Sequence, residues 1–178
     1  MCIRDRALTG RFDKVVSIEM IEAVGHQFLD TYIAQCNNLL KEDGTLLLQA
    51  ITMKDQHYLK SLKQVDFIKK FIFPGGFLPS VNSISDAFTR VSDLQIVHLE
   101  DIGYHYARTL KDWRQRFIDK LDRVREQGYP ENFIRMWIFY LCYCEGSFRE
   151  AYIGTVQVVA NKPRAKTPSF NMAIEKLK

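Results

Sequence analysis

Two carboxylates, Glu19 and Glu22, stand three residues apart directly after an apolar stretch at residues 15–18. The stretch is β-branched and predicts a strand that ends at Ile18. Ligands bind at the carboxyl ends of strands in open α/β sheets, so two carboxylates at this edge form a candidate ligand site. The alternative is structural, because acidic residues near the start of a helix complement its dipole. The pattern alone leaves both interpretations open.

The following elements place another polar side chain at the same edge. Apolar residues recur at helical spacing from Phe28 to Leu40 and predict an amphipathic helix. Residues 41–44 are typical of a turn, and residues 45–51 form a nearly continuous apolar stretch, as expected for a parallel strand buried on both faces. The order strand–helix–strand predicts a right-handed crossover. Gln49 then faces the same edge as Glu22, although a glutamine there could simply bond to nearby backbone.

The rest of the chain continues the α/β pattern. Ser83, Thr109 and Pro130 each stand where a helix is expected to begin. The last helix is apolar on most sides, which predicts that it is buried. The last strand is expected to be antiparallel at a sheet edge. The predicted elements are a helical piece at 65–72, a turn at 73–79, a helix at 84–91, a strand at 94–99, helices at 110–126 and 131–148, and a strand at 153–160.

Four phenylalanines fall within eleven residues, at Phe67, Phe71, Phe73 and Phe77. Such a cluster could form an apolar wall for a lipid chain. Core packing is the commoner use of aromatic residues and is the alternative.

Composition narrows the class of protein. The chain has 178 residues, enough for one domain with a real core, and its net charge of +4 permits contact with anionic lipid but does not demand nucleic acid. No apolar run reaches the roughly 20 residues needed to cross a bilayer, and the polar amino end is not a secretory signal. The four cysteines lack the spacing of a zinc site, so no metal is expected, and reduced cysteines fit a cytoplasmic protein.

Four motifs follow one another along the chain. They are FDKVVSIEMIEAVG at 12–25, FIFPGGFLPS at 71–80, HYARTL at 105–110 with Trp113, and the set Tyr140-Leu141, Cys144, Phe148-Arg149 and Gln157. Together they resemble the cyclopropane-fatty-acyl-phospholipid synthase family, which includes the mycolic acid cyclopropane synthases and relatives that add a methyl or methoxy branch. The resemblance covers about residues 8–161.

The resemblance implies a class I methyltransferase fold. This chain would hold a truncated, Rossmann-like sheet with an antiparallel terminal hairpin and an inserted helical lid. It implies S-adenosylmethionine (SAM) as cofactor and an unsaturated acyl chain of a membrane phospholipid as substrate. In the family the alkene attacks the sulfonium methyl, a carbocation results, and proton loss to a bicarbonate ion precedes ring closure. A cytoplasmic enzyme in peripheral contact with the membrane, and a homodimer of the full-length parent, fit the same resemblance.

Carried over residue by residue, Glu22 and Tyr140 match the glutamate and the tyrosine that hold the bicarbonate ion. Ile51 matches the position whose backbone amide binds it. Gln49 stands where many members have a histidine, and an amide can still donate a hydrogen bond. Glu19 is a weaker candidate for contact with SAM. The residues expected to line the acyl pocket are Tyr106, Phe71, Phe73, Phe77 and Trp137.

The family's cysteine ligand and its Gly-rich SAM loop belong to an amino-terminal half that this sequence lacks. We therefore expect residues 8–161 to be the carboxy-terminal part of one methyltransferase domain, inactive by itself. Residues 1–7 would be a non-native leader and residues 162–178 a polar, mobile tail. The strand at 15–18 should then be an exposed apolar edge. Two alternatives stay open: a non-catalytic fragment, and a methyltransferase of the same fold that acts on an amine.

Overall fold

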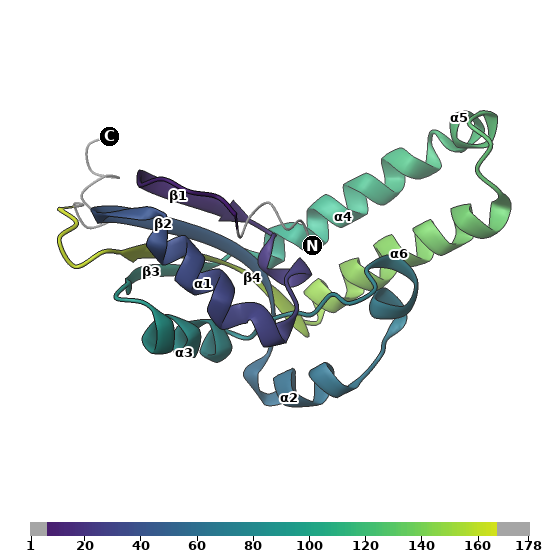
Figure 1. Ribbon diagram of the computed structural model, residues 1–178. Helices are drawn as coiled ribbons and strands as arrows, with labels where there is room; N and C mark the ends of the chain where they lie inside the picture. The colour runs from purple at the N-terminus through teal and green to yellow at the C-terminus, as the bar shows by residue number, and fades with distance from the viewer. Residues whose placement is uncertain (1–6, 167–178) are drawn as a thin grey trace, which may run out of the picture. The chain divides into compact units, whose positions relative to one another are not determined.

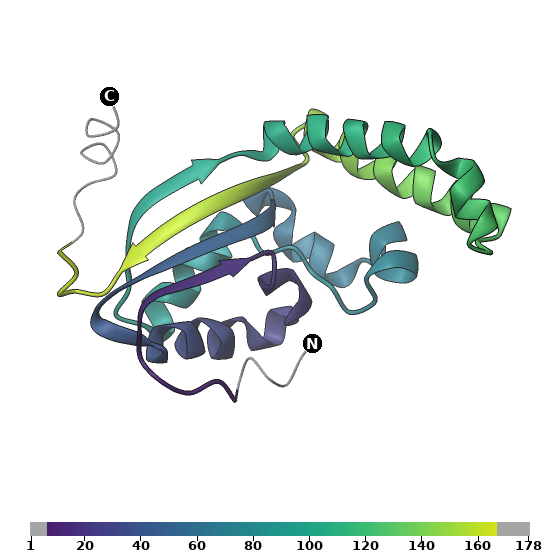
Figure 2. The same cartoon turned by 90° about the horizontal axis from the view of Figure 1, so that it is seen from above.

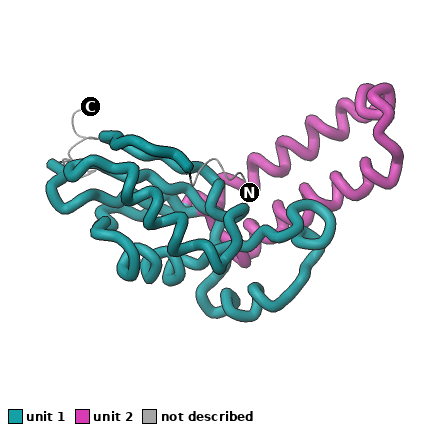
Figure 3. The backbone as a smooth tube through the Cα atoms, in the orientation of Figure 1, with its two compact units in different colours: residues 1–101, 156–178 teal, residues 102–155 magenta. Residues whose placement is uncertain are grey.

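The computed structural model describes residues 7–166 (Figure 1), and these form two compact units. Residues 7–101 and 156–166 make up the first unit, and residues 102–155 make up the second (Figure 3). In chain order the elements are β1 (Phe12–Ile18), two short 3-10 turns (Ile21–Ala23 and His26–Phe28), α1 (Leu29–Asn38), β2 (Leu40–Met53), α2 (Asp55–Lys63), a π-helical turn (Ile68–Ile72), α3 (Val81–Val91), β3 (Gln95–Asp101), α4 (Gly103–Ile118), α5 (Leu121–Glu126), α6 (Glu131–Arg149) and β4 (Ile153–Asn161).

The sheet is mixed and has the strand order β1-β2-β4-β3 (Figure 2). β1 and β2 are parallel, with Val15 opposite Leu46 and Ile18 opposite Gln49, as the strand–helix–strand pattern predicts. β4 is antiparallel to β3, also as predicted. Its expected place at a sheet edge is wrong, because β4 lies between β2 and β3. An inner strand needs apolar side chains on its packed face, and Val156, Val158 and Ala160 are fully buried.

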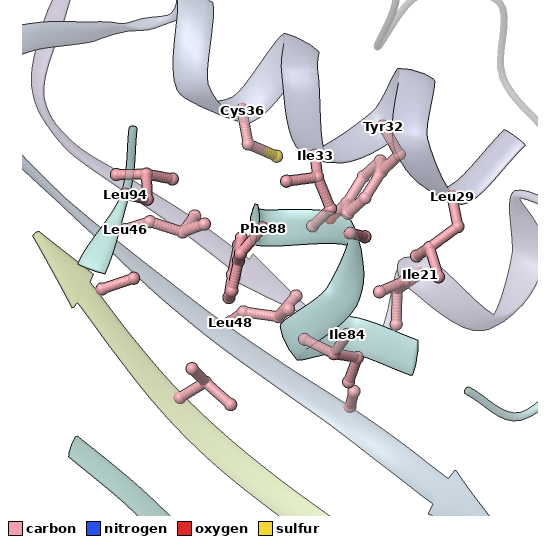
Figure 4. Close-up of a cluster of buried hydrophobic side chains, with 14 of the residues drawn as sticks. Ile21, Leu29, Tyr32, Ile33, Cys36, Leu46, Leu48, Ile84, Phe88 and Leu94 are labelled. Atoms are coloured by element: carbon pink, nitrogen blue, oxygen red, sulfur yellow. The ribbon is translucent and has the colours of Figure 1, made fainter. Parts of the chain in front are cut away.

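The core lies between the sheet and the pair of helices α1 and α3 (Figure 4). Alternate residues of β2, among them Leu46 and Leu48, point into this layer and are inaccessible to solvent. They meet Ile33 from α1 and Phe88 from α3. This layer fixes β2, and therefore the edge at which Gln49 stands.

β1 is an edge strand with apolar residues exposed, which confirms the prediction of an open edge. Val16 is 63% exposed and Ile18 50% exposed. A groove of about 170 Å³ runs beside this strand, between β1 and α1. Ser17 and Tyr32 are hydrogen-bonded to each other there, and burial raises the pKa of the Tyr32 phenol above its usual value.

Several predicted boundaries are wrong. Residues 41–44 belong to β2, where the pairing with β1 jumps from Phe12–Leu40 to Lys14–Thr45. The cap of α3 is Ser80, whose Oγ accepts from the Ser83 N–H at 3.1 Å while Ser83 Oγ accepts from the Ser80 N–H at 2.8 Å. This reciprocal capping box starts the helix three residues earlier than predicted.

The single helix predicted over residues 110–126 is wrong as well, because the structure has two helices there. α4 begins at Gly103, seven residues before the predicted start, and ends at Ile118, before α5. Thr109 lies inside α4, and its Oγ1 donates to the His105 carbonyl at 3.2 Å instead of capping. The short helix α2 had no counterpart in the sequence prediction.

The second unit is built on α4 and α6, which pack on each other (Figure 3). The buried Glu145 accepts a hydrogen bond from Arg114 at 2.7 Å and forms an ion pair with Arg149 at 2.7 Å. α6 begins and ends close to the predicted residues, but it is not buried all round. Ile134 and Leu141 are buried, whereas Phe139 is half exposed.

Within residues 7–166, no helix has the length and apolar character to span a membrane, and no three His, Cys, Asp or Glu side chains group in a way that could hold a metal ion. The first residues of the predicted tail form ion pairs within the first unit: Lys162 donates to Asp93 at 2.6 Å, and Arg164 pairs with Glu42. Residues 1–6 and 167–178, and with them most of the expected leader and tail, lie outside the described residues.

Candidate functional site

The carboxyl end of β1 turns sharply at Glu19. Its φ of 51° lies in the left-handed region, which non-glycine residues rarely occupy. The Glu19 N–H donates to the Gln49 carbonyl at 2.9 Å, so this turn is pinned to the end of β2. Strained backbone of this kind clusters at functional sites.

Glu22 is the central residue of the site. It lies in the turn Ile21–Ala23, and its Oε1 accepts the Ile51 N–H at 2.6 Å. Its second oxygen, Oε2, is buried and has no hydrogen-bond partner among residues 7–166. Burial raises the pKa of the Glu22 carboxyl to about 7, against the lowering effect of the backbone hydrogen bonds. An unpaired buried carboxyl oxygen is costly, and a ligand that bonds to it would remove that cost.

The Phe–Pro–Gly–Gly–Phe turn closes over Glu22. The Phe77 N–H donates to the Glu22 carbonyl at 3.0 Å, and Pro79 accepts from the Met53 N–H at 2.8 Å. Gly75, at φ 82°, supplies the left-handed residue that the turn requires. The two motifs at 12–25 and 71–80 are therefore parts of one structure.

Gln49 is held between two side chains. Its Nε2 donates to Glu19 Oε1 at 2.8 Å, and its Oε1 accepts from Gln157 Nε2 at 2.8 Å. These bonds fix which end of the amide faces which neighbour. Gln157, on β4, was not among the predicted site residues. Its signal was a long polar side chain between two apolar ones, Val156 and Val158, at a position that belongs to the family resemblance.

Four of the predicted site residues of the first unit lie close together. Glu19, Glu22, Gln49 and Ile51 share one polar cluster at the carboxyl ends of β1 and β2. The Ile51 N–H and the Gln49 amide, which were expected to face an anion, bond instead to the two glutamates.

The phenylalanine cluster was predicted either to form an apolar wall for a lipid chain or to pack in the core, and its members differ in this respect. Phe77 packs in the core, as the structural alternative has it. Phe71 and Phe73 are 54% and 57% exposed, which leaves them available to an apolar ligand.

The other predicted residues belong to the second unit. Tyr106 packs on Phe148 with ring centroids 5.1 Å apart, and Trp137 packs on Tyr140 at 5.0 Å. Trp137 also continues a run of aromatic rings along α6 through Phe133 to Tyr129. The convergence of Tyr140 and Tyr106 with Glu22 stays a prediction.

The sheet order, the antiparallel terminal hairpin and the polar cluster at the strand ends define an α/β protein with a partial class I methyltransferase fold. The family model for mycolic acid cyclopropane synthetase matches residues 3–158, and the chain belongs to this family. It is a family of SAM-dependent methyltransferases of cyclopropane fatty acid and lipid biosynthesis.

Individual proteins of known name are similar to this chain and support the same family. The chain is 41% identical over 152 residues to the tuberculostearic acid methyltransferase UfaA1 of Mycobacterium tuberculosis, covering 85% of this chain and 36% of that protein. It is 37% identical over 158 residues to the cyclopropane-fatty-acyl-phospholipid synthase of Escherichia coli K12, covering 88% and 39%. The crystal structure of CmaA1, a mycolic acid cyclopropane synthase complexed with SAH and CTAB, superposes with a TM-score of 0.79 at 26% identity, covering 89% and 58%. The chain thus spans well under half the length of the two curated relatives.

Proposed function

We propose that this chain supplies the anion site of a SAM-dependent enzyme that adds a methylene or methyl group to the double bond of an unsaturated acyl chain in a phospholipid. The observation that carries the proposal is the Oε2 of Glu22 at the carboxyl end of β1, which is buried and has no hydrogen-bond partner among residues 7–166. The family membership and the likeness to UfaA1 and the E. coli enzyme supply the reaction class.

A bicarbonate ion suits this cluster chemically. Its hydroxyl group is a donor, and Glu22 Oε2 is an acceptor without a partner among the described residues. Gln49 offers an amide donor from β2. In the bound state that we propose, the Ile51 N–H is shared between Glu22 and the ion. Glu22 would then orient the ion, which would supply the base for the proton that the acyl chain loses.

The fit to SAM is only partial. In this fold the cofactor lies across the carboxyl ends of the strands, against a Gly-rich turn. Glu19 stands at such an end, but its carboxylate already accepts from Gln49, and no Gly-rich turn precedes it in the sequence. When bound, SAM supplies the methyl group. We infer that this chain alone holds SAM poorly and is inactive.

The remaining residues would shape the acyl pocket. The exposed Phe71 and Phe73 offer apolar surface, and the rings of Tyr106, Trp137 and Tyr140 offer faces that stabilise positive charge on the acyl chain. Apolar surface of this kind favours a lipid over an amine substrate. We expect the protein to work in the cytoplasm at the membrane surface.

The test is methyl transfer by this chain fused behind the amino-terminal portion of the E. coli enzyme. Transfer from labelled SAM to dioleoyl phosphatidylglycerol vesicles is expected, with a loss of at least a hundredfold in kcat for Glu22→Gln and little change in SAM affinity. Equal loss of both would mean that Glu22 only supports the fold. Transfer to an amine, without transfer to the lipid, would overturn the proposal in favour of the alternative substrate class.

A further inference from the structure

A basic hollow of about 580 Å³ lies in the second unit, and none of its lining residues is among those assigned to the reaction. Its lining comes from one face of α4 and from the end of α6. The lining residues are Tyr104, Ala107, Arg108, Lys111, Asp112 and Arg149. Three are cationic and one is anionic, so the hollow carries a net positive charge.

The helix periodicity explains why these side chains gather. Tyr104, Arg108 and Lys111 are spaced by four and three residues, which places them on one stripe of α4. The three side chains of the stripe are exposed, whereas Ala107 and Leu110 beside it are buried. Arg149 is held at the rim by its ion pair with Glu145 at 2.7 Å.

Two of the cations are uncompensated. Within residues 7–166 neither Arg108 nor Lys111 has an ion-pair partner, whereas Arg114, Arg125 and Arg149 each bond to a carboxylate. The arginine can present two parallel N–H donors and the lysine a point charge, a combination suited to phosphate oxygens. Tyr104, 86% exposed at the rim, is an amphipathic ring of the kind enriched where protein meets a bilayer interface.

We propose that this hollow binds the phosphodiester headgroup of an anionic phospholipid in a membrane surface. The inference rests on the proposed function, because the acyl substrate there is part of a phospholipid. It adds a contact that recognises the headgroup and holds the protein on the bilayer. Complementary charge argues for a lipid phosphate over a neutral or zwitterionic surface.

Vesicle binding by the full chain tests the proposal. On dioleoyl phosphatidylglycerol vesicles at low salt, Arg108→Gln with Lys111→Gln should weaken binding about tenfold. A matched variant, Arg116→Gln with Lys120→Gln, removes the same charge from positions that do not line the hollow and should change binding less than twofold. Dioleoyl phosphatidylcholine vesicles should bind all three proteins weakly and alike.

Asp112→Asn provides a gain-of-binding test that misfolding cannot imitate. It removes the one carboxylate of the lining and should strengthen binding to phosphatidylglycerol at least twofold. Equal loss in the two charge-matched variants would show diffuse attraction and overturn the proposal. So would preferential binding of an acidic peptide over the vesicles. Methyl transfer by the fused enzyme is a separate readout, so the site can fail while the proposed function stands.

Discussion

The Ile51 N–H donates to Glu22 Oε1 at 2.6 Å, across 29 residues of sequence. This bond ties the acidic turn after β1 to the end of β2 and leaves the other carboxyl oxygen of Glu22 buried without a partner among the described residues. The carboxyl is therefore held in place and yet chemically unsatisfied.

The pH dependence of stability should report this state of Glu22. The folded carboxyl keeps its proton up to a pKa of about 7, whereas an unfolded glutamate loses it near pH 4.3. The folded state therefore binds more protons in between, and this contribution to stability is present below pH 4 and lost as pH rises through 7. Between pH 5 and pH 8, Glu22 should account for a fall of about 2–3 kcal/mol in the free energy of unfolding.

Urea unfolding of the wild type and of Glu22→Gln at pH 5 and pH 8 measures this fall. Glutamine keeps an acceptor for the Ile51 N–H and does not titrate, so the difference between the two proteins isolates the carboxyl. Parallel pH profiles would mean that Glu22 is ionised like an exposed glutamate.

The hydrogen bond between Gln157 and Gln49 should show energetic coupling. Gln157→Leu leaves the side-chain oxygen Oε1 of the buried Gln49 without this donor. It should lower the free energy of unfolding by about 1–3 kcal/mol. The double variant with Gln49→Leu should lose less than the sum of the single losses. Gln115→Leu, which removes an exposed bond to Asp119, is the control and should stay within about 0.5 kcal/mol.

The open edge of β1 should drive self-association. Exposed apolar edge strands pair with other chains, and an edge lysine blocks this. Val16→Lys should therefore slow aggregation several-fold, followed by light scattering at micromolar protein. Val97→Lys on the other edge is the control, because β3 carries a register irregularity and the acidic pair Glu100 and Asp101. An equal effect of both substitutions would show that general charge, not the β1 edge, controls aggregation.

Calorimetric titration of SAM into the chain should give no micromolar binding. Each missing hydrogen bond to a charged cofactor group is worth roughly 1.5–3 kcal/mol, and a Gly-rich turn normally supplies several. Micromolar affinity would show that residues 7–166 already form the cofactor site.

Tyr106 and Tyr140 should differ in importance in the fused enzyme. Tyr106 is three residues into α4, about 5 Å of helix from the chain that leaves β3, whereas Tyr140 is nine residues, about 14 Å, from the end of α6. By chain connectivity, Tyr106 is therefore the phenol with the shorter helical path to a strand. Tyr106→Phe should then lower kcat more than Tyr140→Phe does. The opposite order would support the tyrosine assigned by family resemblance.

The local sequence pattern was sufficient to predict each of the four strands of the described sheet and the parallel pairing of β1 with β2. β-branched runs and the helix between them are short-range signals, and a right-handed crossover then leaves little choice. The pairing of Glu22 with the end of β2 followed from the same logic, since strand ends share an edge. The start of α6 after Pro130 also needed only local sequence.

Tertiary structure decided what depends on contacts distant in sequence. β4 lies inside the sheet, and not at its edge, because it is hydrogen-bonded to both β2 and β3, which are distant from it in sequence. The Gln49 amide faces Glu19 and Gln157 because a strand 108 residues away along the chain carries the second partner. The raised pKa of Glu22 likewise comes from burial of its carboxyl, and burial is a property of the assembled chain that no run of neighbouring residues specifies.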